Sequence, residues 1–342
     1  MQRLVVLAPN WLGDAVMALP AVADLRRHFG GARLAVAARL SVAALFTMVP
    51  GIDEVLELTG RGGLAAVSTW RDDVSAVAGG GFDLAILLPN SFASALTVSR
   101  AGVPERWGLA TDARTRLLTR SAPKPPKGLH QAGYYQALVA AFGVANGPMH
   151  ARVDAPAHVR PPAPDGRFVV LAPGAAYGKA KQWPEARFAE LATLIRRDGR
   201  AVAVIGSRAD LPTATAIADA AGAGSGAPVV NLAGRTSLAE LASLMARADA
   251  VVSNDSGAMH LAGAVGAPVV AIFGATNEHR TSPLTRDAQA AAPRIMTAEA
   301  WCRPCMLREC PIDHRCMTGV SAAAVFEALG PGVPARGRTP SP

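Results

Sequence analysis

Short apolar runs alternate with longer segments that carry apolar residues at helical spacing in the first part of the chain. Each apolar run is short enough to be one buried strand, and the runs cover residues 3–8, 33–38, 55–58 and 84–88. Helical spacing follows over residues 14–29, 41–48 and 131–143. Alternation of strand and helix is typical of an α/β domain that is built on a parallel sheet.

A proline-rich stretch interrupts this alternation, which then restarts. Prolines at 156, 161, 162 and 164 disfavour a helix and fit a linker. After it, strands are expected over residues 168–172, 201–205, 229–232, 250–253 and 269–273, with helices over 184–198, 211–221, 238–246 and 259–264. We therefore predict a first domain over 1–155, a linker over 156–166, a second domain over 167–329 and a disordered tail over 330–342. The predicted fold class is α/β, with two Rossmann-like, doubly wound domains that face a central cleft.

Composition supports a folded protein with an anionic partner. The chain has 342 residues, of which 50% are hydrophobic and 18% charged, which excludes a disordered protein. The formal net charge of +8 favours nucleic acid, a phosphorylated substrate or an anionic membrane surface. Nucleic acid ranks last because only 5% of residues are aromatic and no nucleic-acid-binding motif is present. Because no signal peptide or membrane span is visible, we expect a cytoplasmic protein, with peripheral contact to a membrane left open.

The first motif is Asn10–Trp11–Leu12–Gly13–Asp14, between the first strand and the first helix. Asp14 lies where the helix should begin, and aspartate is a preferred N-cap residue. The same carboxylate can instead act as a general base at the carboxyl end of the first strand. Both interpretations remain open.

Two loops of the second domain suit a phosphate group. The loop over residues 172–184 is glycine-rich and carries Lys179 and Lys181, although Ala180 stands where a P-loop requires Ser or Thr. In the loop over residues 253–257, Asp255 or Ser256 can cap a helix whose first N–H groups have no internal partner. The alternatives are a solvated loop and a cap without ligand.

Gly257 in the second of these loops permits close approach of a ligand, and His260 follows one helical turn later. A lone helical histidine is more often structural than catalytic. Two anion-suited loops at the carboxyl ends of strands in one domain point towards a diphosphate.

All four cysteines fall within one short segment, at Cys302, Cys305, Cys310 and Cys316. In a cytosolic protein such clustering indicates a structural zinc site over disulfides. Free thiols and two local disulfides are the alternatives.

A basic stretch over residues 100–127 includes Arg106 and Arg114. A charge run is usually a solvated face, but this one can also hold an anionic acceptor.

The motif at residues 10–14, the block from Pro173 to Pro184 and the segment from Asn254 to Gly274 together resemble glycosyltransferase family 9, the ADP-heptose:lipopolysaccharide heptosyltransferases, and their heptosyltransferase II branch above all. The resemblance runs from residue 3 to about residue 325. It implies a GT-B fold and an inverting transfer of L-glycero-D-manno-heptose from ADP-heptose to the heptosyl-Kdo2-lipid A inner core of lipopolysaccharide. It implies no cofactor for catalysis.

The resemblance also implies roles for individual residues. The family's proposed catalytic aspartate matches Asp14, and its phosphate-contacting lysine matches Lys181. Its diphosphate-binding amides match Ser256 and Gly257. The family's contact to the donor ribose aligns with Asp210, and its contact near the adenine aligns with Thr236. Asp255 would orient the loop or contact the donor sugar. His260 completes the set of donor-binding residues. We place the acceptor contacts at Asn10, Trp11, Gly13, Arg106 and Arg114.

Three other functions remain as alternatives. One is a different sugar-nucleotide enzyme on the same fold, such as an epimerase or a transferase with another donor or acceptor. A second, a dinucleotide oxidoreductase, is disfavoured because residues 8–14 contain one glycine where its fingerprint needs three. The third is a non-enzymatic protein that uses the cysteines to bind a metal or a partner.

Overall fold

The computed structural model describes residues 2–60, 66–224 and 226–330. The chain divides into two compact units, Met1–Asp154 and Ala155–Pro342. The tail predicted to be disordered falls almost wholly on residues 331–342, which lie outside the described part of the chain.

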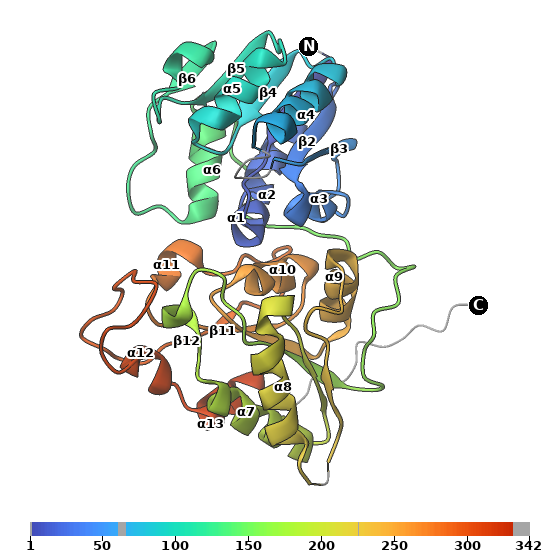
Figure 1. The fold of residues 1–342 in the computed structure, drawn as a ribbon, viewed down its shortest axis with the longest axis vertical. Helices are drawn as coiled ribbons and strands as arrows, with labels where there is room; N and C mark the ends of the chain where they lie inside the picture. Colours follow the sequence, from blue (N-terminus) through green and yellow to red (C-terminus); the bar gives the residue numbers. More distant parts are fainter. Residues whose placement is uncertain (1, 61–65, 225, 331–342) are drawn as a thin grey trace. The chain divides into compact units, whose positions relative to one another are not determined.

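The first unit contains a six-stranded parallel sheet in the order β3-β2-β1-β4-β5-β6 (Figure 1). Its strands are β1 (Arg3–Leu7), β2 (Arg33–Arg39), β3 (Glu54–Leu58), β4 (Leu84–Leu87), β5 (Glu105–Leu109) and β6 (Arg120–Ala122). Its helices are α1 (Leu12–Met17), α2 (Leu19–His28), α3 (Leu40–Phe46), α4 (Ala66–Gly79), α5 (Phe92–Arg100) and α6 (Gln131–Ala140), with a 3₁₀ turn, η2, at Thr115–Leu117.

The second unit repeats this topology, with the strand order β12-β11-β10-β7-β8-β9. Its strands are β7 (Phe168–Ala172), β8 (Ala201–Val204), β9 (Val229–Asn231), β10 (Ala250–Asn254), β11 (Val269–Ile272) and β12 (Arg294–Met296). Its helices are α7 (Glu185–Arg197), α8 (Leu211–Gly222), α9 (Leu238–Arg247), α10 (Gly257–Val265), α11 (Glu278–Thr281), α12 (Arg315–Thr318) and α13 (Ala322–Leu329), with 3₁₀ turns η3 (Lys179–Lys181) and η4 (Arg208–Asp210).

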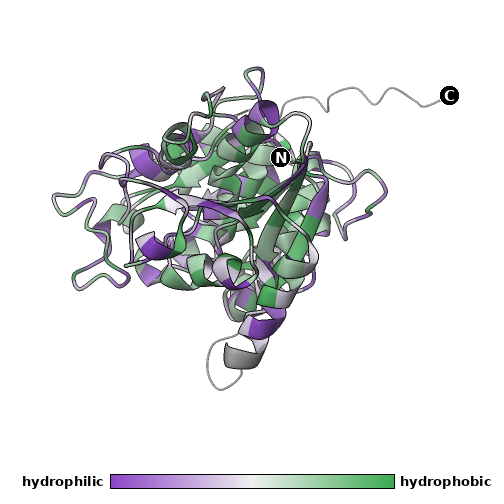
Figure 2. Ribbon diagram, turned by 90° about the horizontal axis from the view of Figure 1, so that it is seen from above, coloured by the Kyte–Doolittle hydropathy of each residue, from purple (hydrophilic) through white to green (hydrophobic). Residues whose placement is uncertain are grey.

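The two sheets confirm the predicted α/β class and explain the apolar runs. Every residue of β4, β7 and β10 is buried, as expected for parallel strands that helices cover on both faces. Figure 2 shows central strands in the green of hydrophobic residues. In the second unit the core includes Trp183, whose indole N–H donates a hydrogen bond to the carbonyl of Val320 (2.9 Å).

The sequence prediction differs from the structure at the first helix and in the basic stretch. The helix expected over 14–29 is two helices, because Pro20 lies in the first turn of α2 and has no N–H to continue the hydrogen-bond ladder of α1. Within the basic stretch, β5 and β6 complete the first sheet. Both strands begin with charged residues, so neither forms the apolar run that predicted the other strands. None of the described helices combines the length and apolar character that a membrane crossing requires.

Candidate functional site

The first candidate half-site lies at the carboxyl edge of the first sheet. The strand order reverses between β1 and β4, and ligands of such sheets bind beyond the strand ends at this point. The loop after β1 leads to Asp14, and the loop after β4 carries Asn90. Both residues therefore flank the switch point of this sheet.

Asp14 is the third residue of α1 and lies, half-buried, in its first turn. The N-cap position belongs to Trp11, which makes no side-chain capping hydrogen bond. The N-cap interpretation of Asp14 is therefore wrong, because the helix begins two residues earlier than its periodicity indicates.

The carboxylate of Asp14 lies near the buried phenol of Tyr135. Tyr135, on α6, is 5% exposed, and α1 packs against α6. Burial raises the pKa of Tyr135, and the negative charge of Asp14 raises it further. The Tyr135 phenol therefore stays neutral, and Asp14 has an uncharged, buried aromatic side chain as its neighbour.

Sequence reasoning did not select Asn90, Tyr134 or Tyr135 as site residues. The side-chain amide of Asn90 donates a hydrogen bond to the Tyr134 hydroxyl (2.7 Å). The rings of Tyr134 and Tyr135 meet edge to face, with centroids 5.7 Å apart. The position of Asn90 after an apolar strand is the signal that would have found it.

The remaining acceptor-side predictions from the first motif fall at the same edge. Asn10 and Trp11 are exposed, and the Trp11 side chain is 65% accessible. Gly13 lies half-buried in the first turn of α1. The contact of these residues with an acceptor stays a prediction.

Arg106 and Arg114 do not join this group. The Arg106 guanidinium, near the amino end of β5, donates to the carbonyls of Leu117 and Val103 (2.7 and 2.6 Å). Arg114 is fully buried, and its guanidinium donates to the carbonyls of Leu109 and Pro89. Both arginines satisfy backbone acceptors, so the structure gives them structural roles instead of free positive charge for an acceptor.

The second candidate half-site lies at the carboxyl edge of the second sheet, at its own switch point between β7 and β10. The ammonium of Lys181, in the loop after β7, lies 2.6 Å from Oδ2 of Asp255, which follows β10. The same oxygen accepts a hydrogen bond from the hydroxyl of Thr276 (2.7 Å). Thr276 follows β11, and its place just after a strand was a signal that sequence reasoning missed.

The fully buried side chain of Asn254 holds the two loops together. Its Nδ2 donates to the carbonyl of Pro173 (2.7 Å), and its Oδ1 accepts from the backbone N–H of Trp183 (3.0 Å). Asn254 thus binds the start and the end of the loop that carries Lys181. Such buried, fully paired polar groups fix a local geometry.

The N-terminus of α10 adds a site for an anion. Ser256 is the N-cap residue by position, but its side chain makes no capping hydrogen bond; its hydroxyl lies 3.1 Å from that of Ser253. The first N–H groups of the helix, beginning at Gly257, are therefore not satisfied by a side-chain cap. With the helix dipole they attract negative charge next to Lys181 and Asp255.

Asp210 and Thr236 lie at the carboxyl edge of the next two strands. Asp210 ends η4 after β8, and its Oδ2 accepts from the backbone N–H and hydroxyl of Ser207 (2.8 and 2.7 Å). A Cβ at Gly174 would lie 2.7 Å from this carboxylate, so Asp210 packs directly on the loop after β7. Thr236 lies half-buried, just before α9. The predicted donor residues thus line one sheet edge.

His260 differs from the other predicted donor residues because it is 2% exposed within α10. Its burial favours the structural role that a lone helical histidine usually has.

The cysteine segment, residues 302–316, holds all four thiols of the chain, and the zinc site stays a prediction. All four cysteines are free thiols in the structure. Among residues 2–60, 66–224 and 226–330, no group of three or more His, Cys, Asp or Glu side chains is arranged to hold a metal ion. Cys316 is buried in the core, and the other three cysteines are half-buried. Burial, followed by the charges of the other thiols, raises the pKa of Cys316.

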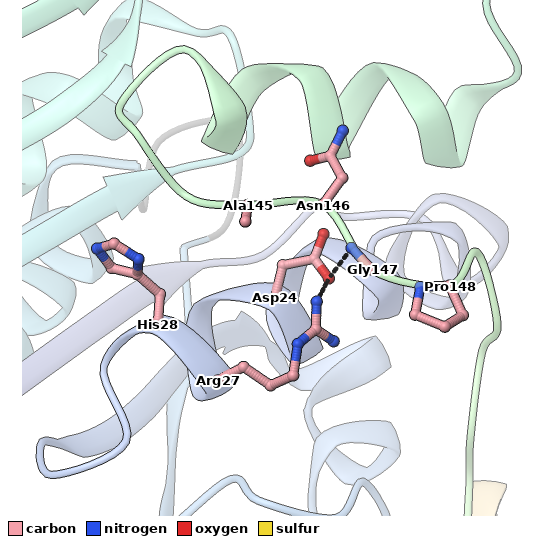
Figure 3. Close-up of a pocket in the computed structure, with 7 residues that line it drawn as sticks. All are labelled: Asp24, Arg27, His28, Ala145, Asn146, Gly147 and Pro148. Atoms are coloured by element: carbon pink, nitrogen blue, oxygen red, sulfur yellow. Dashed lines mark hydrogen bonds and ion pairs between the residues drawn. The ribbon is translucent and has the colours of Figure 1, made fainter.

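Two surface hollows lie away from these residues. A hollow of about 400 Å³ is lined by Asp24, Arg27, His28 and the loop over residues 145–148 (Figure 3). The carboxylate of Asp24 is already bonded there by Arg27, Gln136 and the N–H of Gly147. This first hollow lies beside the last turn of α2, which leads into the amino end of β2. The second hollow is lined by residues that include Ala250 and Val269, at the amino ends of β10 and β11. Neither hollow contains a predicted site residue.

Comparison with known proteins gives one consistent result. The family model for glycosyltransferase family 9 (heptosyltransferase) matches residues 74–315. Lipopolysaccharide heptosyltransferase 2 of Escherichia coli K12 is 29% identical over 307 residues, which is 84% of this chain and 87% of that protein. The solved structure of the E. coli ADP-heptose lipopolysaccharide heptosyltransferase II matches with a TM-score of 0.78 and 25% identity, over 96% of this chain and 98% of that one. The E. coli heptosyltransferase WaaC with ADP has the same fold, with a TM-score of 0.76 at 17% identity, over 97% of this chain and 100% of that one.

Proposed function

The chain belongs to glycosyltransferase family 9, and we propose that it transfers L-glycero-D-manno-heptose from ADP-heptose to the heptosyl-Kdo2-lipid A inner core, with inversion at the anomeric carbon. The observation that carries the proposal is the pairing of Lys181 with Asp255 at the switch point of the second sheet. A diphosphate needs a cation and free N–H groups, and both stand together there.

The second unit binds the donor. The Lys181 ammonium and the first N–H groups of α10, from Gly257 onward, hold the diphosphate of ADP-heptose. Asp255 holds Lys181 in place before the donor binds, and Asp210 accepts hydrogen bonds from the ribose. As the bond to the anomeric carbon breaks, ADP gains negative charge, and these preorganised groups stabilise it.

The first unit binds the acceptor. Asp14 accepts the proton of the attacking acceptor hydroxyl and so acts as general base. The Asp14 carboxylate is half-buried near Tyr135, in the first turn of α1 at the carboxyl edge of the first sheet. Asn10 and Trp11, exposed beside it, contact the acceptor sugars.

No cofactor is required in this scheme. The positive charge that the departing diphosphate needs comes from Lys181 and the N-terminus of α10. The four cysteines take no part in the chemical step.

A single assay tests the proposal. The full chain is incubated with ADP-heptose and heptosyl-Kdo2-lipid A, and the product should gain the mass of one heptose, with NMR showing the inverted anomeric configuration. The Asp14→Asn variant serves as the control for a protein-dependent reaction. Transfer from UDP- or GDP-sugars alone, or thermal stabilisation by UDP but not ADP, would contradict the donor assignment and favour another sugar-nucleotide enzyme.

A further inference from the structure

The cysteine segment packs on the loop that carries Lys181. The Tyr177 hydroxyl donates to the carbonyl of Met306 (2.8 Å), and the N–H of Ala180 donates to the carbonyl of Arg308 (2.9 Å). The ring nitrogen Nε2 of His314 lies 3.0 Å from the carbonyl of Ala180. The segment therefore supports this loop along its length, although sequence reasoning gave it no role at the donor site.

The contact between segment and loop is a direct approach of two backbones. A Cβ at Gly178 would lie 2.3 Å from the carbonyl oxygen of Arg308 and 2.9 Å from its Cα. Glycine is thus required at position 178 for this contact. The backbone of Arg308 is consequently held in a fixed place beside the phosphate loop.

A second set of contacts ties the segment to the loop after β11. The N–H of Met306 donates to the carbonyl of Ala275 (2.8 Å), and the Arg303 guanidinium pairs with Glu278 (2.7 Å). The next residue of that loop, Thr276, is the one that bonds Asp255. The segment thereby joins the loops on both sides of the Lys181–Asp255 pair.

Two positively charged side chains contact the ring of Tyr177. The ammonium of Lys181 lies 4.7 Å from its centroid, and the guanidinium carbon of Arg308 lies 5.4 Å from it. Lys181 is paired with Asp255, whereas Arg308 is exposed and, within the described part of the chain, forms no ion pair. An exposed guanidinium without a carboxylate partner, on the same ring as a second cation, is suited to a bound anion with more than one negative charge.

We propose that Arg308 is a second diphosphate-binding side chain of the donor site, held beside Lys181 by the ring of Tyr177. This inference rests on the proposed function, because the ligand is the diphosphate of the donor nucleotide. One lysine neutralises only part of that charge. The planar fork of Arg308 supplies paired N–H donors that match phosphate oxygens.

Titration calorimetry on the full chain tests the assignment with two ligands, ADP and adenosine, the latter measured by displacement of ADP. For Arg308→Gln we expect ADP affinity to fall about tenfold, the loss typical of one hydrogen bond to a charged group, with adenosine affinity unchanged. Arg308→Lys should recover part of the ADP affinity because it keeps the charge. Tyr177→Leu should weaken ADP binding as well, because it removes the ring that holds both cations.

Arg315→Gln is the matched control on the same segment. Its guanidinium is already paired with Asp313 (2.8 Å), so ADP affinity should not change. Equal ADP affinity of Arg308→Gln and wild type, or an equal loss for ADP and adenosine, would overturn the phosphate contact while leaving the donor site intact. A wild-type chain that binds no ADP would instead overturn the proposed function, and this inference with it.

Discussion

The ammonium of Lys181 and the carboxylate of Asp255 form a 2.6 Å ion pair between the loops that follow the two central strands of the second sheet. Both side chains are largely buried, at 13% and 5% exposure. The pair therefore orders the site before any ligand arrives, and it also links ligand binding to stability.

Replacement of Lys181 by Ala should lower both ADP affinity and turnover, the affinity by about 10-fold or more, because a charged hydrogen bond to phosphate is lost. It should also lower the free energy of unfolding by about 1–3 kcal/mol, because Asp255 stays buried without its cation. Calorimetry and urea denaturation measure the two effects. Lys179→Ala, which removes an exposed lysine of the same loop, is the control. Wild-type ADP affinity in Lys181→Ala would show that Lys181 does not contact the diphosphate.

Replacement of Asp14 by Asn should reduce kcat by about 100-fold to 10,000-fold, the usual contribution of a general base. ADP affinity should stay near that of the wild type, because Asp14 belongs to the other unit. Steady-state kinetics with calorimetry separate the two. Asp72→Asn, which removes an exposed carboxylate of α4, controls for the loss of charge. Turnover near that of the wild type in Asp14→Asn would exclude Asp14 as the base.

Replacement of Arg114 by Gln should lower the free energy of unfolding by about 1–3 kcal/mol, because several buried carbonyls lose their donor. The KM for the acceptor should change little. Arg116→Gln, at an exposed position two residues later, should have no effect on stability. A stable Arg114→Gln protein with a raised acceptor KM would restore the acceptor role that the basic stretch suggested.

Alkylation with iodoacetamide should distinguish the cysteines. The thiolate is the reactive form, and a raised pKa leaves less thiolate at any given pH. Cys316, whose pKa is raised by burial, should therefore react last, and only at higher pH than Cys302, Cys305 and Cys310. Mass spectrometry of labelled peptides gives the order, and urea should abolish the difference.

The same experiment tests the zinc hypothesis. Protection of all four thiols, together with about one equivalent of zinc by elemental analysis, would establish the metal site.

Much of the donor half-site followed from local sequence. Asp255 and Gly257 come directly after an apolar strand, and Lys181 lies in the loop that follows another. Parallel strands bring their carboxyl ends to one edge, so the proximity of the two loops could be predicted. The family resemblance supplied the roles of these residues, which spacing alone did not.

The parts that sequence missed depend on contacts between distant segments. Tyr177 meets Met306, 129 residues away, and no local pattern signals that meeting. Arg114 was misjudged for a related reason: a charge run predicts an exposed face, but β5 and the loops around it supply enough carbonyls to bury one guanidinium. Pro20 was visible in the sequence, yet helical periodicity continued past it and concealed the break.

The two sheets share one strand order, and this separates the residues proposed for donor specificity from those proposed for acceptor specificity. Each unit has its own reversal point, so the residues proposed for the acceptor lie before Asp154 and those proposed for the nucleotide lie after Ala155. Under the proposed function, mutations that change recognition of one substrate fall in a different stretch of the chain from the residues proposed to bind the other. The proposed assignment therefore allows specificity for the acceptor to change while specificity for the donor nucleotide is kept.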